Sequence, residues 1–321
     1  MFRETAGVVA RMVEIPVDDL TPGEVVIRAE WSGINFKDAL GVTGRAPIYK
    51  RFPIDAGIDV AGQVESSSDG RYKPGDAVLV NGMGLGETHD GGFAQMVRVP
   101  ADWVVPMPAG LDSREAMALG TAGFTAALAL HRMENNGQAP EQGPIAVTGA
   151  TGGVGSAAIT MLKRRGYQVV AVSGRPEHEA YLRSLGADEV STPEALALGT
   201  RPLESTRFGG AIDNVGGPVL SGLIGHVGLW GNVACVGNAG SPAFEATVFP
   251  LILRGVSLLG ASSANCPMPL RASIWNRLGA DLKPPSLDLI VSRAVPLSEV
   301  IPACGTLMNR TALGRVLVDC R

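Results

Sequence analysis

The stretch IAVTGATGGVGSAA, residues 145–158, determines the expected fold of this chain. It begins with an apolar run and ends in small residues that favour a helix, so a strand, a glycine turn and a helix are expected in this order. Gly149, Gly152 and Gly155 recur at every third position. Glycine lets a backbone turn tightly and approach a pyrophosphate closely, and the free N–H groups at a helix N-terminus attract an anion. Because a further strand follows one helix later, we expect this loop to hold a phosphate rather than to be a plain turn.

Strands and helices are expected to alternate beyond this loop. The expected strands lie within 144–150, 168–174, 209–217, 231–240 and 255–263, and the expected helices within 152–166 and 175–187. Gly186 is expected to end the second of these helices. Such alternation is typical of a Rossmann fold, a doubly wound parallel sheet with helices on both faces.

The rest of the chain has a different pattern of expected strands and helices. Short apolar segments separated by Pro-Gly turns predict a β-rich region up to about residue 110. The segment 112–133 begins with Asp and Ser and continues in Ala and Leu, which predicts one long helix. The tail, 293–320, is expected to form a strand, a helix and a final strand that return to the first domain. We therefore expect a β-rich catalytic domain from residues 1–115 and 285–321, and a cofactor domain from residues 116–284.

Composition excludes several classes of protein. The formal net charge is −4, which argues against binding to nucleic acid or to an anionic membrane. Residues 214–244 carry no charge, but glycines and Pro218 interrupt them, so a membrane-spanning helix is not expected. The 4 cysteines have neither CxxC nor Cys/His spacing, so no metal site is expected. Free thiols and the lack of a signal-peptide core favour a cytoplasmic protein.

The end of the second expected strand distinguishes the two nicotinamide cofactors. An NAD site carries an acid there, which accepts a hydrogen bond from the ribose 2′-OH. This chain has Ser173, Gly174 and Arg175 instead. Serine can donate to a 2′-phosphate and arginine can pair with it, so we expect NADPH rather than NADH. The alternative for Arg175 is a solvated residue at a helix start.

The motifs together resemble those of the medium-chain dehydrogenases/reductases. GINFKDAL, FPIDAGIDVAG, GLGETHDGGFAQ, GTAGFTAALAL, TGATGGVGSAA and VSGRPEHEAYLRSLGA are similar to the zinc-independent quinone oxidoreductase branch, and within it to the acryloyl-CoA reductase subfamily. The resemblance implies a GroES-like catalytic domain beside the Rossmann domain. It also implies a homodimer paired through the edge strand of the cofactor domain, here 255–263. Zinc alcohol dehydrogenases carry a Cys and a Gly-His-Glu in segments where this chain has Asp38 and Gly57-Ile58-Asp59, so zinc chemistry is not expected.

The implied reaction is hydride transfer from NADPH to the β-carbon of a short 2-enoyl-CoA such as acryloyl-CoA. Phe36 stands where the subfamily has a tyrosine beside the nicotinamide, so the ring remains and the hydroxyl is lost. Asn35 is expected to donate to the enolate oxygen, or else to form a turn. His89 is expected to donate a proton, or else to brace its loop. Asp38 is expected to cap the following helix or to pair with a neighbour rather than to act as an acid.

The remaining expected contacts are to the cofactor. Loops at the carboxyl ends of the parallel strands contribute Asn214 and Asn238, and for Asn238 a turn role is the alternative. For Thr121, which is expected to face the nicotinamide, the alternative is a hydrogen bond to its own backbone. The full set of expected cofactor-binding residues is Thr121, Gly149, Thr151, Gly152, Gly153, Val154, Ser173, Gly174, Arg175, Asn214, Asn238, Ile252, Ser263 and Asn309.

Two other functions remain open from the sequence. Arg45, Lys50 and Arg51 form a basic loop that either holds CoA phosphates or is simply solvated. A quinone or enone reductase of the same branch would not need this loop. A binding protein that keeps NADPH without turnover is a further alternative. In each case the partner is a small molecule.

Overall fold

The glycine-rich stretch connects a strand to a helix, β8 (Ile145–Thr148) to α3 (Gly153–Arg164), as the sequence predicts. The structure is a computed structural model that describes residues 1–4, 7–309 and 312–321. The chain forms two compact units. The first unit is Met1–Ala122, Ser263–Ala280 and Val291–Arg321, and the second unit is Gly123–Ser262 and Asp281–Ile290.

The second unit contains a parallel six-stranded sheet in the order β10-β9-β8-β11-β12-β13. Its other strands are β9 (Val169–Val172), β10 (Glu189–Ser191), β11 (Phe208–Asp213), β12 (Val227–Cys235) and β13 (Ser257–Gly260). Every residue of β8 and β9 is buried, as in parallel sheets that helices cover on both faces. The strand order reverses between β8 and β11, where such sheets bind their ligands. The expected Rossmann fold is confirmed.

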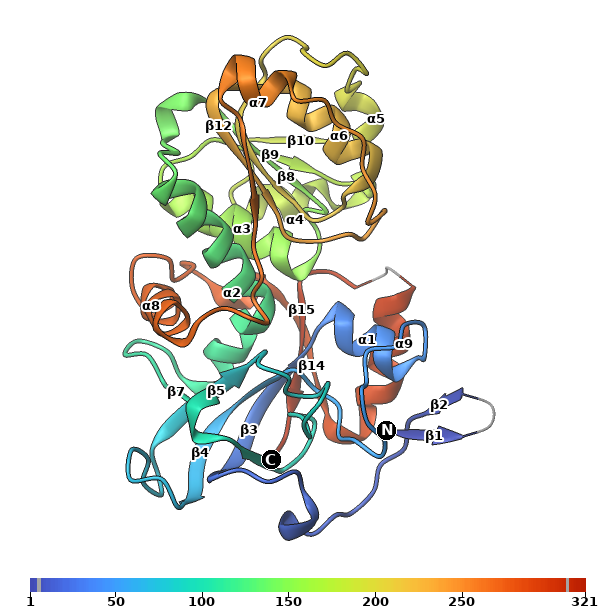
Figure 1. The fold of residues 1–321 in the computed structure, drawn as a ribbon, viewed down its shortest axis with the longest axis vertical. Coiled ribbons are helices and arrows are strands. Elements are labelled where there is room, and N and C mark those ends of the chain that lie inside the picture. The colour runs from blue at the N-terminus through green and yellow to red at the C-terminus, as the bar shows by residue number, and fades with distance from the viewer. Residues whose placement is uncertain (5–6, 310–311) are drawn as a thin grey trace. The chain divides into compact units, whose positions relative to one another are not determined.

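The helices of this unit lie along the sheet (Figure 1). They are α3, α4 (Glu179–Ser184), α5 (Pro193–Leu196), α6 (Gly217–His226) and α7 (Phe249–Arg254). The single helix expected over 175–187 is wrong in extent. A 3₁₀ turn at Pro176–His178 precedes α4, because a proline disfavours helical backbone in the residue before it. Gly186 follows the helix with φ 106°, as expected for its end.

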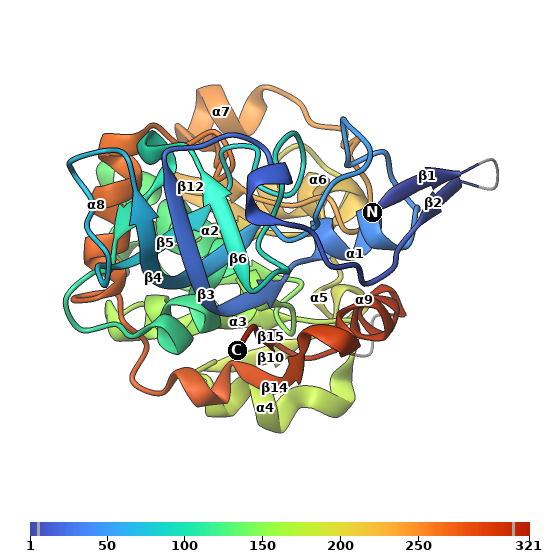
Figure 2. The same cartoon turned by 90° about the horizontal axis from the view of Figure 1, so that it is seen from below.

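The first unit is built on a mostly antiparallel sheet, and Figure 2 shows β3 between β4 and β6. The strands of this sheet are β3 (Val25–Ile34), β4 (Asp59–Ser67), β5 (Ala77–Asn81), β6 (Met96–Val99), β7 (Val105–Pro106), β14 (Val291–Pro296) and β15 (Arg315–Asp319). β1 (Phe2–Glu4) and β2 (Gly7–Val9) form a separate two-stranded sheet. Along β3, Val25, Ile27 and Ala29 alternate inward and are almost fully buried. This is the period-two pattern of a strand with one face on the core.

The tail returns to this sheet as expected. β15 pairs antiparallel with β3, and β14 lies beside β15. The helix between them is α9 (Val300–Met308), which packs against α1 (Phe36–Val42).

The long helix expected over 112–133 is α2 (Ser113–Asn135), but it is not continuous. Gly120 has φ 51° and ψ −154°, so the helix breaks there and restarts at Thr121. Neither motif nor composition predicts this break, because its cause lies in distant segments of the first unit.

The two units also divide the chain differently from the expected boundaries. Residues 263–280, which were expected in the cofactor domain, group with the first unit and contain α8 (Met268–Leu278). The physical reason is a buried anchor. Arg271 donates to the backbone and side-chain oxygens of Asn81 at 2.6 and 2.9 Å, and the Trp275 indole donates to the same amide oxygen at 3.0 Å. Across the described ranges, no helix is both long and apolar enough to span a bilayer.

Candidate functional site

The glycine loop has the geometry of a phosphate cradle. Gly149 adopts φ 56°, a left-handed conformation that side chains resist. A Cβ on Gly155 would lie 2.5 Å from the Gly149 carbonyl oxygen, so only glycine lets α3 pack against the turn. Gly152 is the N-cap of α3, and no acid occupies the first turn of this helix. The free N–H groups of the first turn therefore form a positive end without a nearby carboxylate.

The end of β9 carries the two side chains that were expected to select the cofactor. Ser173 is buried, and its hydroxyl accepts from the Arg175 backbone N–H at 3.1 Å. The Arg175 guanidinium donates to the Thr151 hydroxyl in the glycine loop. Burial lowers the pKa of Arg175. The Arg175 guanidinium thus links the end of β9 to the glycine loop.

A buried acid that the sequence did not single out fixes the next strand end. Asp213 is fully buried at the end of β11, and it accepts from the Thr148 hydroxyl at 2.6 Å and from the Gly216 N–H at 2.7 Å. Burial raises its pKa. The neighbouring Asn214 side chain donates to the Thr148 carbonyl at 2.8 Å. Asn214 therefore links β11 to β8. Asp213 could have been recognised from the sequence as a lone acid at the end of an apolar strand.

Two other expected cofactor residues of this unit lie in exposed places. Asn238 is exposed in the loop after β12. The neighbouring Ala239 N–H donates to the Asn214 carbonyl at 3.1 Å and holds this loop against the end of β11. Ile252 lies on α7 and is 68% exposed. Because Ile252 has exposed apolar neighbours, its position suits a protein interface as well as a cofactor site.

In the first unit, a buried ion pair and its hydrogen-bond partners join four distant segments of the chain. The Arg315 guanidinium lies 3.2 Å from Asp59 Oδ2, and their side chains are 3% and 0% exposed. Asp59 Oδ2 also accepts from the Asn35 amide at 2.7 Å, while Asp59 Oδ1 accepts from the Thr121 hydroxyl at 2.6 Å. We call Asp59, Arg315, Asn35 and Thr121 the Asp59 cluster. The sequence offered only a weak signal for it, an acid within an apolar strand.

The break in α2 exists to make room for this cluster. A Cβ on Gly120 would lie 2.5 Å from Asp59 Oδ2 and would also collide with the Arg315 guanidinium. The Thr121 N–H, which opens the second helical segment, donates to both Asp59 oxygens at 3.0 and 2.9 Å. Asp59 therefore caps a helix N-terminus, where the helix dipole favours a negative charge.

The expected role of Asn35 as a donor to an enolate oxygen conflicts with this geometry. Its two amide hydrogens bond to the Gly33 carbonyl at 3.1 Å and to Asp59 at 2.7 Å, and its oxygen accepts from Arg315 at 2.8 Å. Asn35 instead forms a capping box with Asp38 at the start of α1, which confirms the expected capping by Asp38. Asp38 accepts from the Asn35 and Ile58 N–H groups, and its burial raises its pKa to about 7.

Three more expected contacts fall in the first unit. Phe36 is the first residue of α1, and its ring is 41% exposed, available for stacking. Ser263 is half-buried, and its carbonyl accepts from Arg271 at 2.8 Å. Asn309 is exposed and its backbone N–H closes the end of α9. These roles remain predictions.

The expected role of His89 as a proton donor also conflicts with the structure. The ring is only 6% exposed, and its two nitrogens lie 3.1 Å from the carbonyl oxygens of Asp90 and Pro22. Its edge packs against Trp103 at a centroid distance of 5.1 Å. His89 therefore braces its loop, which was the alternative.

The basic loop is only partly available for a phosphate. Arg51 donates to Thr21 and lies 3.6 Å from the Asp90 carboxylate. Arg45 and Lys50 are exposed. A CoA phosphate would therefore meet these two residues more readily than Arg51.

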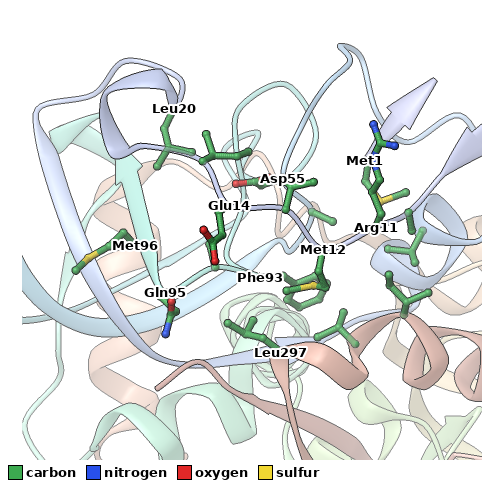
Figure 3. Close-up of a pocket in the computed structure, with 18 of the residues that line it drawn as sticks. Met1, Arg11, Met12, Glu14, Leu20, Asp55, Phe93, Gln95, Met96 and Leu297 are labelled. Carbon is green, nitrogen blue, oxygen red and sulfur yellow. The ribbon is translucent and has the colours of Figure 1, made fainter. Parts of the chain in front are cut away.

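Two cavities, each within one unit, are lined by none of the expected site residues. One of about 270 Å³ lies in the first unit, and Figure 3 shows Met12, Phe93 and Leu297 together on its wall with the carboxylates of Glu14 and Asp55. Another of about 830 Å³ follows α6 in the second unit. Among the residues that the structure describes, no group of three or more His, Cys, Asp and Glu side chains could hold a metal ion.

Comparison with known proteins agrees with this architecture. Residues 21–109 match the family model of the alcohol dehydrogenase GroES-like domain, and residues 153–276 match that of the zinc-binding dehydrogenases.

Similar proteins cover nearly the whole chain. Acrylyl-CoA reductase AcuI of Ruegeria pomeroyi is 44% identical over 317 residues, 98% of this chain and 96% of that protein. YhfP of Bacillus subtilis, whose name assigns it provisionally to the quinone oxidoreductases, is 46% identical over 305 residues, 95% and 92% of the two chains. Its structure with NAD bound has a TM-score of 0.96 at 45% identity, covering 99% and 97%. The yhdH oxidoreductase of Salmonella enterica in complex with NADP has a TM-score of 0.95 at 41% identity, covering 99% and 98%.

Replacing Gly120 by alanine tests the packing of the Asp59 cluster. The added Cβ must displace Asp59 or Arg315 and must adopt φ 51°, so we expect the free energy of unfolding to fall by about 3 kcal/mol in denaturant titrations. Gly70→Ala is the control, because a Cβ there meets nothing within 4 Å. Equal effects of the two substitutions would contradict the described packing.

The raised pKa of Asp38 predicts a pH dependence of stability. Its pKa is about 7 in the folded protein against 3.8 ordinarily, so the folded state holds the proton more tightly and stability falls as the pH rises from about 4 to about 7. Asp38→Asn removes this dependence. Between pH 5 and 7 the wild type should lose roughly 2 kcal/mol relative to the variant in urea unfolding. Asp18→Asn, at an exposed position, should follow the wild type, and parallel curves for all three proteins would contradict the assignment.

Proposed function

The chain belongs to the medium-chain dehydrogenase/reductase superfamily, in the branch of the acryloyl-CoA reductases, and from this premise we propose that it is an NADPH-dependent reductase of short 2-enoyl-CoA thioesters. The double bond of a substrate such as acryloyl-CoA is reduced, and the product is the saturated acyl-CoA. The observation that carries the proposal is the glycine loop together with Ser173 and Arg175 at the end of the next strand. A cytoplasmic location fits the free cysteines.

The chain's own residues fit NADPH. The glycine positions and the acid-free start of α3 suit a pyrophosphate, and Arg175 supplies the cation that a 2′-phosphate requires. When bound, NADPH supplies the hydride that adds to the β-carbon of the substrate. The relative crystallised with NADP supports this choice, while the relative crystallised with NAD makes the preference worth measuring.

The proposed assignments follow the two units. In the second unit, the cofactor contacts are Gly149, Thr151, Gly152, Gly153, Val154, Ser173, Gly174, Arg175, Asn214 and Asn238, with Ile252 the weakest. In the first unit, the contacts are Thr121, Ser263 and Asn309, with Phe36 stacking on the nicotinamide.

The proton that completes the reaction comes from solvent in this proposal. Addition of hydride to the β-carbon leaves an enolate, which takes a proton at the α-carbon. Asn35 and His89 have their polar hydrogens or nitrogens engaged within the first unit, so neither supplies that proton. Water is sufficient, because an enolate α-carbon is strongly basic.

A quinone or enone reductase is the second candidate, and the name of YhfP supports it. Oxidation of NADPH at 340 nm with acryloyl-CoA, crotonyl-CoA and 1,4-benzoquinone separates the two. We expect acryloyl-CoA to give the highest kcat/KM. The double variant Arg45→Ala, Lys50→Ala should raise KM for acryloyl-CoA about tenfold and leave the quinone unaffected, because only the thioester carries phosphates. Preference for benzoquinone would overturn the thioester assignment, and NADPH binding without any turnover would favour a non-catalytic relative.

Arg175→Ala tests the cofactor preference. Loss of a charge-assisted contact should weaken NADPH binding by about 10- to 100-fold in fluorescence titrations and change NADH binding by less than about threefold. Arg183→Ala, on α4 and ion-paired to Glu179, is the control. Equal weakening of both cofactors by the Arg175 substitution would rule out recognition of the 2′-phosphate.

We also propose that the protein is a homodimer that pairs through the second unit. An apolar patch of Leu229, Trp230, Phe249, Ile252 and Leu253 is 48–72% exposed on α7 and on β12, which contact each other (Figure 1). Trp230 holds φ 58° there, which is unusual for a bulky residue. Beside β12, β13 is the last strand in the order of this sheet. Exposed apolar area of this kind marks a protein interface.

Leu229→Asp tests the dimer. A buried carboxylate at the contact should convert the protein from dimer to monomer in sedimentation at micromolar concentration. Met12→Asp, which is 54% exposed on the first unit, should leave the dimer intact. A monomeric wild type, or a Leu229→Asp variant that remains dimeric, would contradict the assignment of this patch.

A further inference from the structure

The cavity of about 270 Å³ in the first unit is lined by none of the residues assigned to the proposed reaction. Its wall is mostly apolar, and Figure 3 shows Met12, Phe93 and Leu297 together on one part of it. Val42 of α1 and Val300 of α9 add to this wall. Ligand pockets in proteins begin at about 300 Å³, so this cavity suits a small molecule with one compact apolar group.

A segment that belongs to no helix or strand, residues 10–15, forms one side of the cavity. Its apolar side chains Met12, Val13 and Ile15 are 40–54% exposed. Across the described ranges, the backbone of residues 11–15 takes part in no hydrogen bond. A segment with so few backbone bonds moves aside at low cost, so a ligand can reach the cavity past it.

Two carboxylates face the same cavity, those of Glu14 and Asp55 (Figure 3). Among the residues that the structure describes, neither carboxylate accepts a hydrogen bond or forms an ion pair. Burial, and to a smaller degree Asp90, raise the pKa of Asp55, while the Met1 ammonium and Arg51 act in the opposite direction. A carboxylate beside apolar side chains is costly until it gains a donor or a cation.

The cationic groups of the same region are held by other partners. The Arg11 guanidinium lies 4.0 Å from the centroid of the Phe2 ring, and the Met1 ammonium donates to a backbone carbonyl at 2.5 Å. The Arg51 guanidinium lies 3.6 Å from the Asp90 carboxylate. The two carboxylates at the cavity are therefore left to pair with a cation from outside the chain.

We propose that this cavity binds a small organic amine, an ammonium group joined to a compact apolar body. The ammonium lies at Glu14 and Asp55, and the apolar body lies against Met12, Phe93 and Leu297. The carboxylates provide the charge complementary to the ammonium, and an aromatic ring on the wall favours a cation near its face. A neutral ligand would leave the carboxylates unpaired, and an anion would be repelled.

The test uses three probes of similar size: phenethylamine, 2-phenylethanol and 3-phenylpropanoate. Binding is followed by NMR of the methionine methyl groups, because Met12 and Met96 both line the cavity. We expect phenethylamine to shift both resonances with a Kd on the order of 1 mM or tighter, and 2-phenylethanol to bind at least about tenfold more weakly. 3-Phenylpropanoate should shift neither, and Met161, buried in α3 of the second unit, should respond to none of the probes.

Two substitutions remove the charges and keep the shapes of the side chains. Asp55→Asn and Glu14→Gln should each weaken phenethylamine about tenfold and change the affinity for 2-phenylethanol by less than about threefold. Glu141→Gln, at an exposed position in the second unit, is the control and should bind as the wild type does. If Asp55→Asn does not fold, Glu14→Gln decides alone, because Glu14 is exposed and its replacement leaves the core intact.

Three results would overturn the proposal: no shift at Met12 or Met96 with phenethylamine up to about 10 mM, equal affinity for phenethylamine and 2-phenylethanol, or affinity for phenethylamine that no substitution changes. The titrations contain neither NADPH nor acyl-CoA. Their outcome is therefore separate from that of the proposed reaction, and either can fail while the other holds.

Discussion

The buried ion pair between Asp59 and Arg315 is the constraint on which the first unit depends. It joins β4 to β15, which lie on either side of β3, and it draws in the start of α1 through Asn35 and the break in α2 through Thr121. Two buried charges are expensive to remove from water, and they persist because each has further hydrogen-bond partners. The glycine at position 120 and the shape of α2 follow from this pair rather than from helix propensity.

In the second unit, too, a buried acid holds neighbouring segments together. Its glycine loop needs close packing and free N–H groups, and a buried acid, Asp213, holds the adjoining strand ends through Thr148 and Gly216. Here the start of α3 leaves backbone N–H groups free, and the Arg175 guanidinium reaches the glycine loop through Thr151. In the segments where zinc alcohol dehydrogenases carry ligands, the first unit has a network of hydrogen bonds. The proposed chemistry relies on positioned polar groups and on solvent.

Much of the fold could be predicted because its signals are local. The glycine spacing at 149–155, the apolar strands and the proline turns each act over a few residues, so the parallel sheet and the returning tail followed from them. The break at Gly120 and the placement of α8 could not be predicted, and for Asn35 and His89 the sequence left both a catalytic and a structural role open. Each depends on a partner far away in the chain, such as Arg315. The sequence around a lone buried acid in a strand does not identify that partner.

The central claim is that hydride reaches the β-carbon and that solvent protonates the α-carbon. The most direct measurement reduces acryloyl-CoA in ordinary water with NADPH carrying deuterium at the transferable C4 position, and locates the label in the product by NMR. We expect one deuterium at C3 of propanoyl-CoA and hydrogen from water at C2. Deuterium at C2, or a product without deuterium, would contradict it.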